Sequence, residues 1–526
     1  MTVRIPFVKT LFVFAVFASV FPGLAQAQKT LNASLAQDPY IIDPTANWLY
    51  DVPANIFVTL VGYDFETSEV VPAGADSWTV SDDGTTYTFH IREGWTWSDG
   101  TPVTANDYAY AFQRIVDPAT AAPMSYRVYV ITGAQAINQG ETSDMGTLGV
   151  KALDDQTLEI KLVAPASWFL SSLASIGHAV PKWAIDAHGD DWTLPGNIVV
   201  NGPYKLTELA PEDLAVLEKN PTYFAAESVD IDTINLYVVK EESTALALYE
   251  DGTLDIVAVP STDLDRVKND PTLSSEFYNG PKNVLYYYDF NALKPPFDNV
   301  EVRQAFAAAV DKQGIVEFIT KGGEVPAPTL TPPGSFGHVP ESAGVGIPFD
   351  PEHAKTLLAK AGYPEGKGLR TITLAFSASE SNSRIAQAVQ QMWQQTLGAT
   401  IELQPVEGQA YSQIAAEGAF DVWRMGWGMD YPDANNIQAE LFTSDVGAPA
   451  IVRNADYDRL IADAAVAQDP AKRQEMYTEA EKILVQDEAG VMPIYWEAEN
   501  LLIKPYLKPV LAGSFNREFW KWTLDN

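Results

Sequence analysis

The chain contains no cysteine among its 526 residues. This absence excludes disulfide bonds, thiolate metal ligands and cysteine nucleophiles together. The fold must therefore be held by its hydrophobic core. A chain of this length can bury a large fraction of its surface, usually as more than one domain.

Positive charge is also scarce. The sequence has 34 Lys and Arg against 69 Asp and Glu, which gives a formal net charge of −35. A nucleic-acid binder needs a positive surface to displace the counterions of the phosphate backbone. Anionic membrane surfaces are disfavoured for the same reason. We therefore expect no nucleic-acid partner, and we interpret the acidity as a source of solubility.

Motifs of known catalytic or metal chemistry are missing as well. The five histidines form no H-E-x-x-H pair and lie near no G-x-S-x-G sequence, and no Gly-rich phosphate loop is present. The one dense group with metal-ligand chemistry is Asp186, His188, Asp190 and Asp191, which we expect to form an exposed turn. We predict no catalytic residue, no metal and no cofactor. A secreted hydrolase stays as an alternative, but no pair of acids is singled out for it.

The N-terminus has the pattern of a secretion signal. Arg4 and Lys9 precede the apolar run 11–18, and Ala25-Gln26-Ala27 supplies the small residues of a cleavage site. The apolar run is shorter than the roughly 20 residues that cross a bilayer. We expect residues 1–27 to be a cleaved signal peptide. No cysteine follows the cleavage site to carry a lipid, so we expect no membrane insertion.

Hydrophobic periodicity predicts alternating strands and helices along the whole chain. Residues 87–91 alternate as a half-buried strand does, between the turn dipeptides Asp83-Gly84 and Asp99-Gly100. Asn106-Asp107 is expected to open the following helix. The sequence therefore predicts a hairpin and then a helix near the N-terminus.

The second half of the chain predicts an α/β fold. Asp350 can cap a helix that Pro351 begins and Gly362 ends. Strands at 371–376 and 400–406 flank a helix, which favours a parallel strand–helix–strand unit. A further strand at 420–427 follows a short helix around 411–416. Helices are also expected over 302–310 and 476–484.

Aromatic residues gather where that last strand ends, in residues 421–432. Ligands of parallel α/β sheets collect beyond the carboxyl ends of the strands. Gly426 and Gly428 would let another backbone approach closely. Taken alone, Asp430 is more typical of a turn and Arg424 of a surface salt bridge.

The sequence resembles the large periplasmic oligopeptide- and dipeptide-binding receptors of ABC importers, which are bacterial extracellular solute-binding proteins of family 5. The resemblance covers nearly the whole chain after residue 27. The segments that carry it, in order, are 75–78, 87–94, 97–107, 201–204, 295–303 and 424–430. The oligopeptide-binding branch is the most similar, notably through residues 195–199 and 286–288.

This resemblance implies an α/β fold of two lobes that close like a clamp, with an additional α/β domain inserted into the first lobe, as in large type II-like solute-binding proteins. The implied ranges are 28–61, 196–283 and 499–526 for the first lobe, 62–195 for the additional domain and 284–498 for the second lobe.

The resemblance also implies a ligand site. Asp430 would hold the ammonium of a peptide, Arg424 would meet its carboxylate, and Trp427 would line a side-chain pocket. The backbone of Gly426 and Gly428 would pair with the ligand strand. Relatives that bind oligopeptides carry further basic residues, but this chain has Ala415 and Asn382 at those positions, so much of the carboxylate capture is missing.

The function implied is that of a monomeric periplasmic receptor, without enzymatic activity, that captures short peptides and delivers them to an inner-membrane ABC permease. The alternative is a receptor of the same fold for another amine-bearing or non-peptide solute, such as an opine-like compound, a nickel complex or an oligosaccharide. Asp430 favours an ammonium-bearing ligand over a sugar.

Overall fold

The computed structural model describes residues 28–39, 41–46, 51–64, 67, 69–444, 450–511 and 517–525. The expected signal peptide, residues 1–27, lies outside the described residues. Within the part described, no helix is both long enough and apolar enough to cross a membrane.

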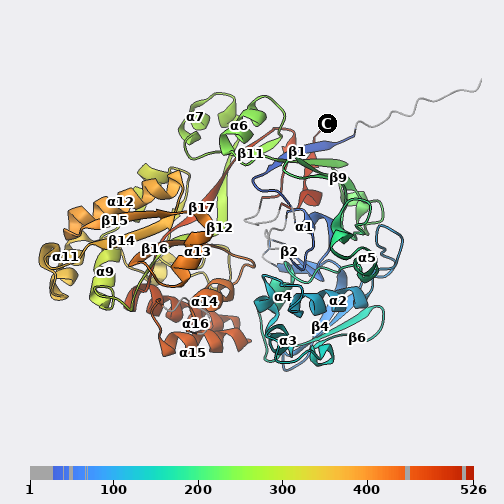
Figure 1. Cartoon of the computed structure of the whole chain (residues 1–526), viewed down its shortest axis with the longest axis horizontal. Helices are drawn as coiled ribbons and strands as arrows, with labels where there is room; N and C mark the ends of the chain where they lie inside the picture. Colours follow the sequence, from blue (N-terminus) through green and yellow to red (C-terminus); the bar gives the residue numbers. More distant parts are fainter. Residues whose placement is uncertain are drawn as a thin grey trace, which may run out of the picture.

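The largest element among the described residues is a mixed sheet of eleven strands that runs through both halves of the molecule (Figure 1). Its order is β15-β14-β16-β12-β17-β11-β1-β10-β9-β8, with β13 beside β17. The strands are β1 Thr30–Leu35, β8 Tyr204–Ala210, β9 Leu214–Lys219, β10 Thr233–Val238, β11 Ile256–Ala258, β12 Phe277–Phe290, β13 Val325–Pro326, β14 Ile372–Ser377, β15 Ile401–Val406, β16 Val422–Gly428 and β17 Val491–Ile503. We call the half with β1 and β8–β11 the first lobe, and the half with β14–β16 the second lobe.

Two long strands, β12 and β17, belong to both lobes. They pair antiparallel from Phe277 opposite Leu502 to Asp289 opposite Val491. β11 pairs with β17 near one end, and β16 pairs with β12 near the other. The register shifts after Pro281, between the parts of β12 that pair with each lobe. Because a hinge needs only a few residues to absorb a rotation, these crossover strands are where the lobes can move.

The first lobe combines its strands with short helices and with the end of the chain. Its other elements are α1 Pro53–Ile56, α6 Glu242–Glu250, α7 Leu264–Asn269, α8 Leu273–Glu276, β18 Leu507–Lys508, β19 Thr523–Leu524 and the 3-10 turns Ala226–Ser228 and Phe519–Lys521. Arg517, near the C-terminus, forms an ion pair with Asp51 at 2.7 Å, and this pair ties the end of the chain to its start.

A separate antiparallel sheet of order β4-β5-β7-β6 forms the additional domain, at the lower right of Figure 1. Its elements, together with the hairpin that leads into it, are β2 Val61–Asp64, β3 Glu69–Pro72, β4 Ala75–Val80, β5 Thr86–Ile91, β6 Val150–Ala152, β7 Thr157–Lys161, α2 Ala105–Val116, α3 Ala134–Asn138, α4 Phe169–Leu173, α5 Lys182–His188 and the 3-10 turns Ser125–Val128, Met145–Thr147 and Gly189–Thr193. The predicted hairpin strand is confirmed as β5. The helix α2 begins one residue before Asn106, because Thr104 is its N-cap and the Thr104 N–H donates to Asp107 Oδ2 at 2.8 Å.

The second lobe contains the predicted strand–helix–strand unit. β14 and β15 are parallel neighbours joined by α12, as expected. Asp350 caps α11 by accepting from the His353 N–H at 2.9 Å. The helices are α9 Val300–Ala308, α10 Lys312–Gly314, α11 Pro351–Lys360, α12 Glu380–Leu397, α13 Gly408–Ala416, α14 Ala434–Phe442, α15 Ala455–Val466 and α16 Pro470–Lys482, with π turns at Ile315–Thr320 and Ile483–Asp487 and 3-10 turns at Glu341–Ala343 and Pro364–Gly366.

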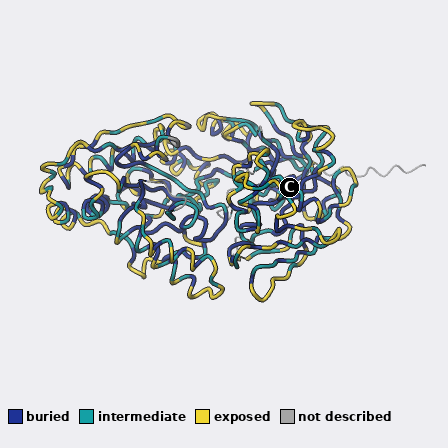
Figure 2. The backbone as a smooth tube through the Cα atoms, turned by 60° about the horizontal axis from the view of Figure 1, so that its bottom comes forward, coloured by how far each residue is buried: buried dark blue, intermediate teal, exposed yellow. Residues whose placement is uncertain are grey.

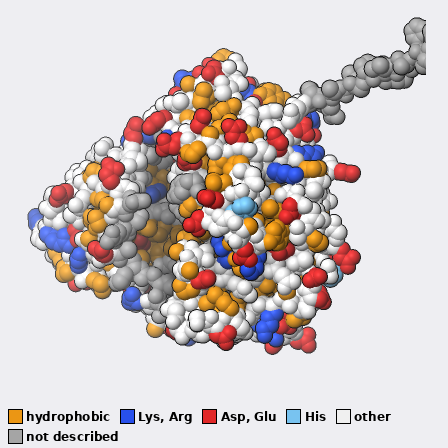
Figure 3. Space-filling view, turned by 45° about the vertical axis from the view of Figure 1, so that its right-hand side comes forward, with side chains coloured by type: hydrophobic (Ala, Val, Ile, Leu, Met, Phe, Trp, Pro, Cys, Tyr) orange, Lys and Arg blue, Asp and Glu red, His pale blue; other side chains and the backbone are white. Residues whose placement is uncertain are grey.

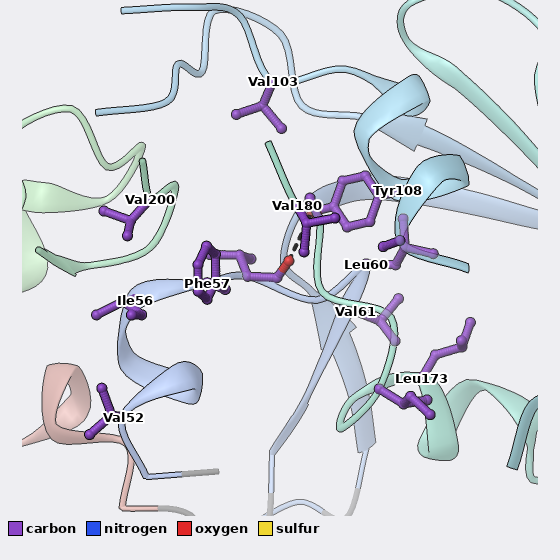
Figure 4. Close-up of a cluster of buried hydrophobic side chains, with 14 of the residues drawn as sticks. Val52, Ile56, Phe57, Leu60, Val61, Val103, Tyr108, Leu173, Val180 and Val200 are labelled. Atoms are coloured by element: carbon purple, nitrogen blue, oxygen red, sulfur yellow. Dashed lines mark hydrogen bonds between the residues drawn. The ribbon is translucent and has the colours of Figure 1, made fainter. Parts of the chain in front are cut away.

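Buried segments run through the interior of both halves of the molecule (Figure 2). One cluster of buried side chains joins the first lobe to the additional domain, and two clusters cover the two faces of the sheet in the second lobe. Figure 4 shows part of the first cluster, where Val180 and Leu60 lie beside Tyr108 of α2 and Phe57 lies between them and Ile56. The Tyr108 hydroxyl donates to the Val58 carbonyl at 3.2 Å. The additional domain therefore shares its core with the first lobe.

Candidate ligand-binding site

The backbone N–H and C=O groups of β16 point alternately toward β12 and toward the opposite edge of the strand, and the candidate site lies at that opposite edge. Asn291 N–H donates to the Asp421 carbonyl, and Met429 N–H donates to the Asn283 carbonyl, both at 2.9 Å. In an antiparallel pair every second residue turns its N–H and C=O toward the partner strand. The odd-numbered residues of β16 therefore face β12, and the even-numbered residues face the opposite edge.

That opposite edge is only partly covered. β14 pairs with β16 only at Val422 and Trp423. The Arg424 carbonyl accepts a hydrogen bond from the Tyr411 hydroxyl. Beyond this point, no described strand pairs with Gly426 and Gly428 on that edge. Their N–H and C=O groups are therefore available to an added strand.

The side chains of Arg424 and Trp427 project from opposite faces of β16, because an odd number of positions separates them. Trp427 packs with the cluster beneath α14–α16. The Arg424 guanidinium lies over the ring of Tyr286, with 4.3 Å to its centroid. A Cβ on Gly426 would come 3.1 Å from Arg424 Nη2, so the absence of a side chain at this position leaves room for the guanidinium.

The guanidinium of Arg424 is surrounded by tyrosines and pairs with no carboxylate among the described residues. Tyr286 stacks on Tyr495 with centroids 4.8 Å apart, and Tyr288 lies edge-on to Tyr286 at 5.8 Å. Arg424 Nε is buried without a described hydrogen-bond partner. Burial alone would lower the pKa of Arg424, but Tyr286, Tyr495 and the carboxylate of Glu497 raise it, so the group stays charged. A ligand carboxylate would meet a guanidinium here that forms no ion pair with a described residue.

Asp430 lies two residues beyond the end of β16 and is partly exposed. Its N–H donates to Asn436 Oδ1 at 2.9 Å, and its Oδ2 accepts from Asn436 Nδ2 at 3.2 Å. The same Nδ2 donates to Glu440 Oε2 at 2.9 Å. Burial raises the pKa of the Glu440 carboxyl to about 8; Arg127 acts against this shift and Asp430 adds to it. Glu440 is thus held largely protonated at neutral pH, and the Asp430 carboxylate is the group here that would meet a cationic ligand.

The additional domain contacts the second lobe beside Asp430. Ser175 Oγ donates to the Asp430 carbonyl at 3.0 Å. The ring of Trp168 stacks on Tyr431 at 5.7 Å, and the Arg127 guanidinium lies 5.4 Å from the same ring. Tyr431 is 2% exposed and belongs to the core cluster of the opposite half. The predicted ammonium site thus lies directly at a contact between the two halves.

The hollow between the halves is visible from outside. Figure 3 shows the surface indented between the second lobe and the rest of the molecule, with Asp and Glu spread over this face. At the crossover strands, residues 279–283 and 496–498 line a cavity of about 240 Å³, closed by parts of 323–333. Lys282 pairs with Glu497 at 3.1 Å in its wall.

Residues that the sequence suggested for other chemistry lie elsewhere. Asp186, His188, Asp190 and Asp191 are exposed on α5 and the turn after it, as expected, and Asp186 pairs with Lys182 at 2.6 Å. His178 is buried, and burial lowers its pKa to about 4. Among the described residues, no group of three or more His, Asp or Glu could hold a metal ion.

The structure joins Trp427 and Asp430 through Asn436, whose Oδ1 also accepts from the Trp427 indole at 3.0 Å. It places Arg424 on the other face of the strand. Ala415 is buried in the core, and Asn382 Nδ2 donates to the Ser377 carbonyl at 2.9 Å, so both positions support the fold.

Sequence reasoning missed several neighbours of the site: Asn436, Glu440, Tyr431, Trp168, Arg127 and the tyrosines around Arg424. Asn436 lies six residues after Asp430, in the first turn of α14, so its place near Asp430 could be inferred from the local sequence. Trp168 and Ser175 are more than 250 residues away from Asp430 in sequence, and nothing local pointed to them.

Known proteins agree with this architecture. A family model described as bacterial extracellular solute-binding proteins, family 5 Middle, matches residues 69–448. The chain is 34% identical over 486 residues to the periplasmic oligopeptide-binding protein OppA of Escherichia coli (strain K12), over 89% of this chain and 88% of that protein. It is also 34% identical over 472 residues to the probable deoxycholate-binding periplasmic protein YgiS of Escherichia coli (strain K12), over 87% and 86%.

A solved structure, that of the Escherichia coli murein tripeptide binding protein MppA, matches with a TM-score of 0.80 at 32% identity. The match covers 95% of this chain and 99% of that chain. The expected fold, two α/β lobes with an additional domain, is confirmed. The chain belongs to the bacterial extracellular solute-binding proteins of family 5.

Proposed function

We propose that this protein is a periplasmic receptor that captures short peptides by adding them as a strand to the open edge of β16. The observation that carries the proposal is this edge, where Gly426 and Gly428 present backbone groups that no described strand uses. A peptide main chain is a row of donors and acceptors, so strand addition binds it without regard to side chains.

The two ends of the peptide would meet opposite charges. Asp430 receives the ammonium, and its Oδ1 accepts no hydrogen bond from a described residue. Arg424 meets the carboxylate of peptides long enough to reach it, through the fork of its guanidinium. Trp427, on the other face of the strand, lines a side-chain pocket. The relative OppA is named for oligopeptides and MppA for a murein tripeptide, which supports a peptide ligand.

Capture would proceed by closure of the lobes about the crossover strands. We assign the first lobe to 28–61, 196–283 and 499–526, the additional domain to 62–195 and the second lobe to 284–498. The register shift after Pro281 in β12 supports the boundary at 283/284. Closure around a ligand buries it and presents one compact shape to a permease.

We also propose that residues 1–27 are a cleaved signal peptide, that the mature protein is a periplasmic monomer without a lipid anchor, and that it hands the peptide unchanged to an inner-membrane ABC permease. The relatives named periplasmic support this location.

Native mass spectrometry of the protein purified from its host tests the proposal. Adducts that fragment as short peptides with a free α-amine are the expected result, and an empty protein should acquire them from a peptide mixture. Adducts that lack an amine, or a protein that takes up no peptide from the mixture, would contradict it.

Replacing Arg424 by alanine should weaken binding in a way that depends on ligand length. Charged hydrogen bonds contribute about 1.5–3 kcal/mol, so peptides whose carboxylate reaches the guanidinium should lose about 10- to 100-fold in affinity. Shorter peptides should lose little. Titration calorimetry with alanine peptides of two to five residues measures this, with Arg459→Ala on the exposed face of α15 as the control. A loss that is the same at every length would remove Arg424 from carboxylate binding.

A further inference from the structure

Asn436 occupies a central position under the candidate site. It lies in the first turn of α14, and its side chain is fully buried. The helix cap before it, Asp433, is held by two hydrogen bonds of 2.7 Å from Arg473. The amide is therefore carried by a helix end that is fixed to the core of the second lobe.

The amide of Asn436 makes all four hydrogen bonds that it can make. Its Oδ1 accepts from the Trp427 indole at 3.0 Å and from the Asp430 N–H at 2.9 Å. Its Nδ2 donates to Asp430 Oδ2 at 3.2 Å and to Glu440 Oε2 at 2.9 Å. An indole and a peptide N–H only donate and a carboxylate accepts, so the four partners allow one orientation of the amide.

We propose that Asn436 is the positioning residue for the amine end of the ligand: its buried amide fixes the Asp430 carboxylate and the Trp427 ring in one geometry. The inference rests on the proposed function, because it assumes that Asp430 receives an ammonium. It adds a residue that sets how strongly the site prefers a free amine.

The chemistry of the side chain explains why an amide is needed here. Asp430 lies in a loop after the strand, where a carboxylate without a fixed partner would sample many rotamers. Asn436 holds Oδ2 and the main chain of Asp430 together and leaves Oδ1 without a described donor. A site held within about 0.5 Å of its working geometry gains affinity because less order has to be created on binding.

Glu440 completes the arrangement from the next turn of α14. It accepts from Asn436 Nδ2 through Oε2 and from the Tyr431 hydroxyl through Oε1, at 2.8 Å. Asp430 Oδ2 and Glu440 Oε2 both lie within hydrogen-bond distance of one nitrogen, so they are no more than about 6 Å apart. Asn436 thereby links Asp430 to a buried acid that its raised pKa keeps largely protonated.

The neighbouring residue offers a matched control. Asn435 is also an asparagine of the first turn of α14 and is 4% exposed. Its Nδ2 donates to the Tyr431 hydroxyl at 3.0 Å, and its side chain forms no hydrogen bond with Trp427 or Asp430, both described residues. Asn435→Ala and Asn436→Ala thus remove the same groups from the same helix turn, but only the second removes the contacts of the site.

The test is the ratio of affinities for tri-alanine and N-acetyl-tri-alanine, measured by titration calorimetry for the wild type and both variants. Asn436→Ala should lower this ratio by about tenfold or more, since a hydrogen bond to a charged group is lost. Asn435→Ala should keep the wild-type ratio. In ¹⁵N-labelled protein, the indole N–H resonance of Trp427, assigned with Trp427→Phe, should shift in Asn436→Ala and stay in place in Asn435→Ala.

An unchanged ratio in Asn436→Ala, or an equal fall in both variants, would overturn the inference. If the alanine variant does not fold, Asn436→Ser replaces it, because one hydroxyl proton cannot serve both carboxylates and the ratio should still fall. A wild type that binds both forms equally would instead count against the proposed function, so the two failures are distinguishable.

Discussion

Asp430→Asn is expected to weaken the binding of peptides with a free amine by several hundredfold, while leaving the fold intact. Removing one partner of a buried ion pair costs about 3–5 kcal/mol, because the other charge stays buried without compensation. On closure of the lobes, the ligand ammonium would be such a charge. Asparagine keeps the shape of the side chain and can still accept a hydrogen bond from Asn436. A loss of affinity is therefore due to the missing negative charge.

Titration calorimetry of the wild type and the variant with tri-alanine measures this effect. Asp463→Asn, an exposed residue of α15, makes the same change of net charge at the surface and should bind as the wild type does. An Asp430→Asn protein with affinity within a few-fold of the wild type would show that the ammonium is held elsewhere.

The second large effect is on stability. Arg473→Met should lower the free energy of unfolding of the second lobe by about 3–5 kcal/mol, because it leaves Asp433 buried and unpaired. Both side chains are about 5% exposed, and the guanidinium donates to both carboxylate oxygens at 2.7 Å. Since Asp433 caps α14, the site residues of that helix should loosen as well.

Urea unfolding followed by circular dichroism checks this prediction. Arg459→Met, on the exposed face of α15, removes the same charge without a buried partner and should change stability little. The double variant Asp433→Asn/Arg473→Met should recover part of the loss, since no unpaired charge is left. Equal stability of Arg473→Met and the wild type would show that the buried pair contributes nothing to the lobe.

Local signals in the sequence predicted local structure well. The capping pattern at Asp350, the alternation of 87–91 and the parallel unit of β14, α12 and β15 follow from chemistry within a few residues. The start of α2 was misplaced by one residue, because Thr104 as well as Asn106 can cap a helix.

Contacts between distant segments could not be predicted in this way. The crossover strands bring β16 next to β12 across more than a hundred residues, and only this pairing shows which edge of Gly426 and Gly428 is open. The stacking of Trp168 on Tyr431 likewise depends on how two domains meet. The lobe ranges and the roles of Asp430 and Arg424 came from the family resemblance alone.

The spacing of Arg424 and Trp427 in the sequence already determines which faces of the strand they occupy. Arg424 and Trp427 are three residues apart in a strand, so they had to face opposite sides of the sheet. The structure confirms this, and it divides the candidate site into a face with a guanidinium and tyrosines and a face with the indole and the Asp430–Asn436 network.

A peptide bound along β16 should have its ammonium at Asp430. Titration of the wild-type protein with matched free and N-acetylated alanine peptides of two to five residues tests it most directly. Acetylation should lower affinity by several hundredfold, as Asp430→Asn does, and the two changes together should lower it no further. Equal affinity of the wild type for the free and acetylated peptides would show that Asp430 does not bind the ligand ammonium.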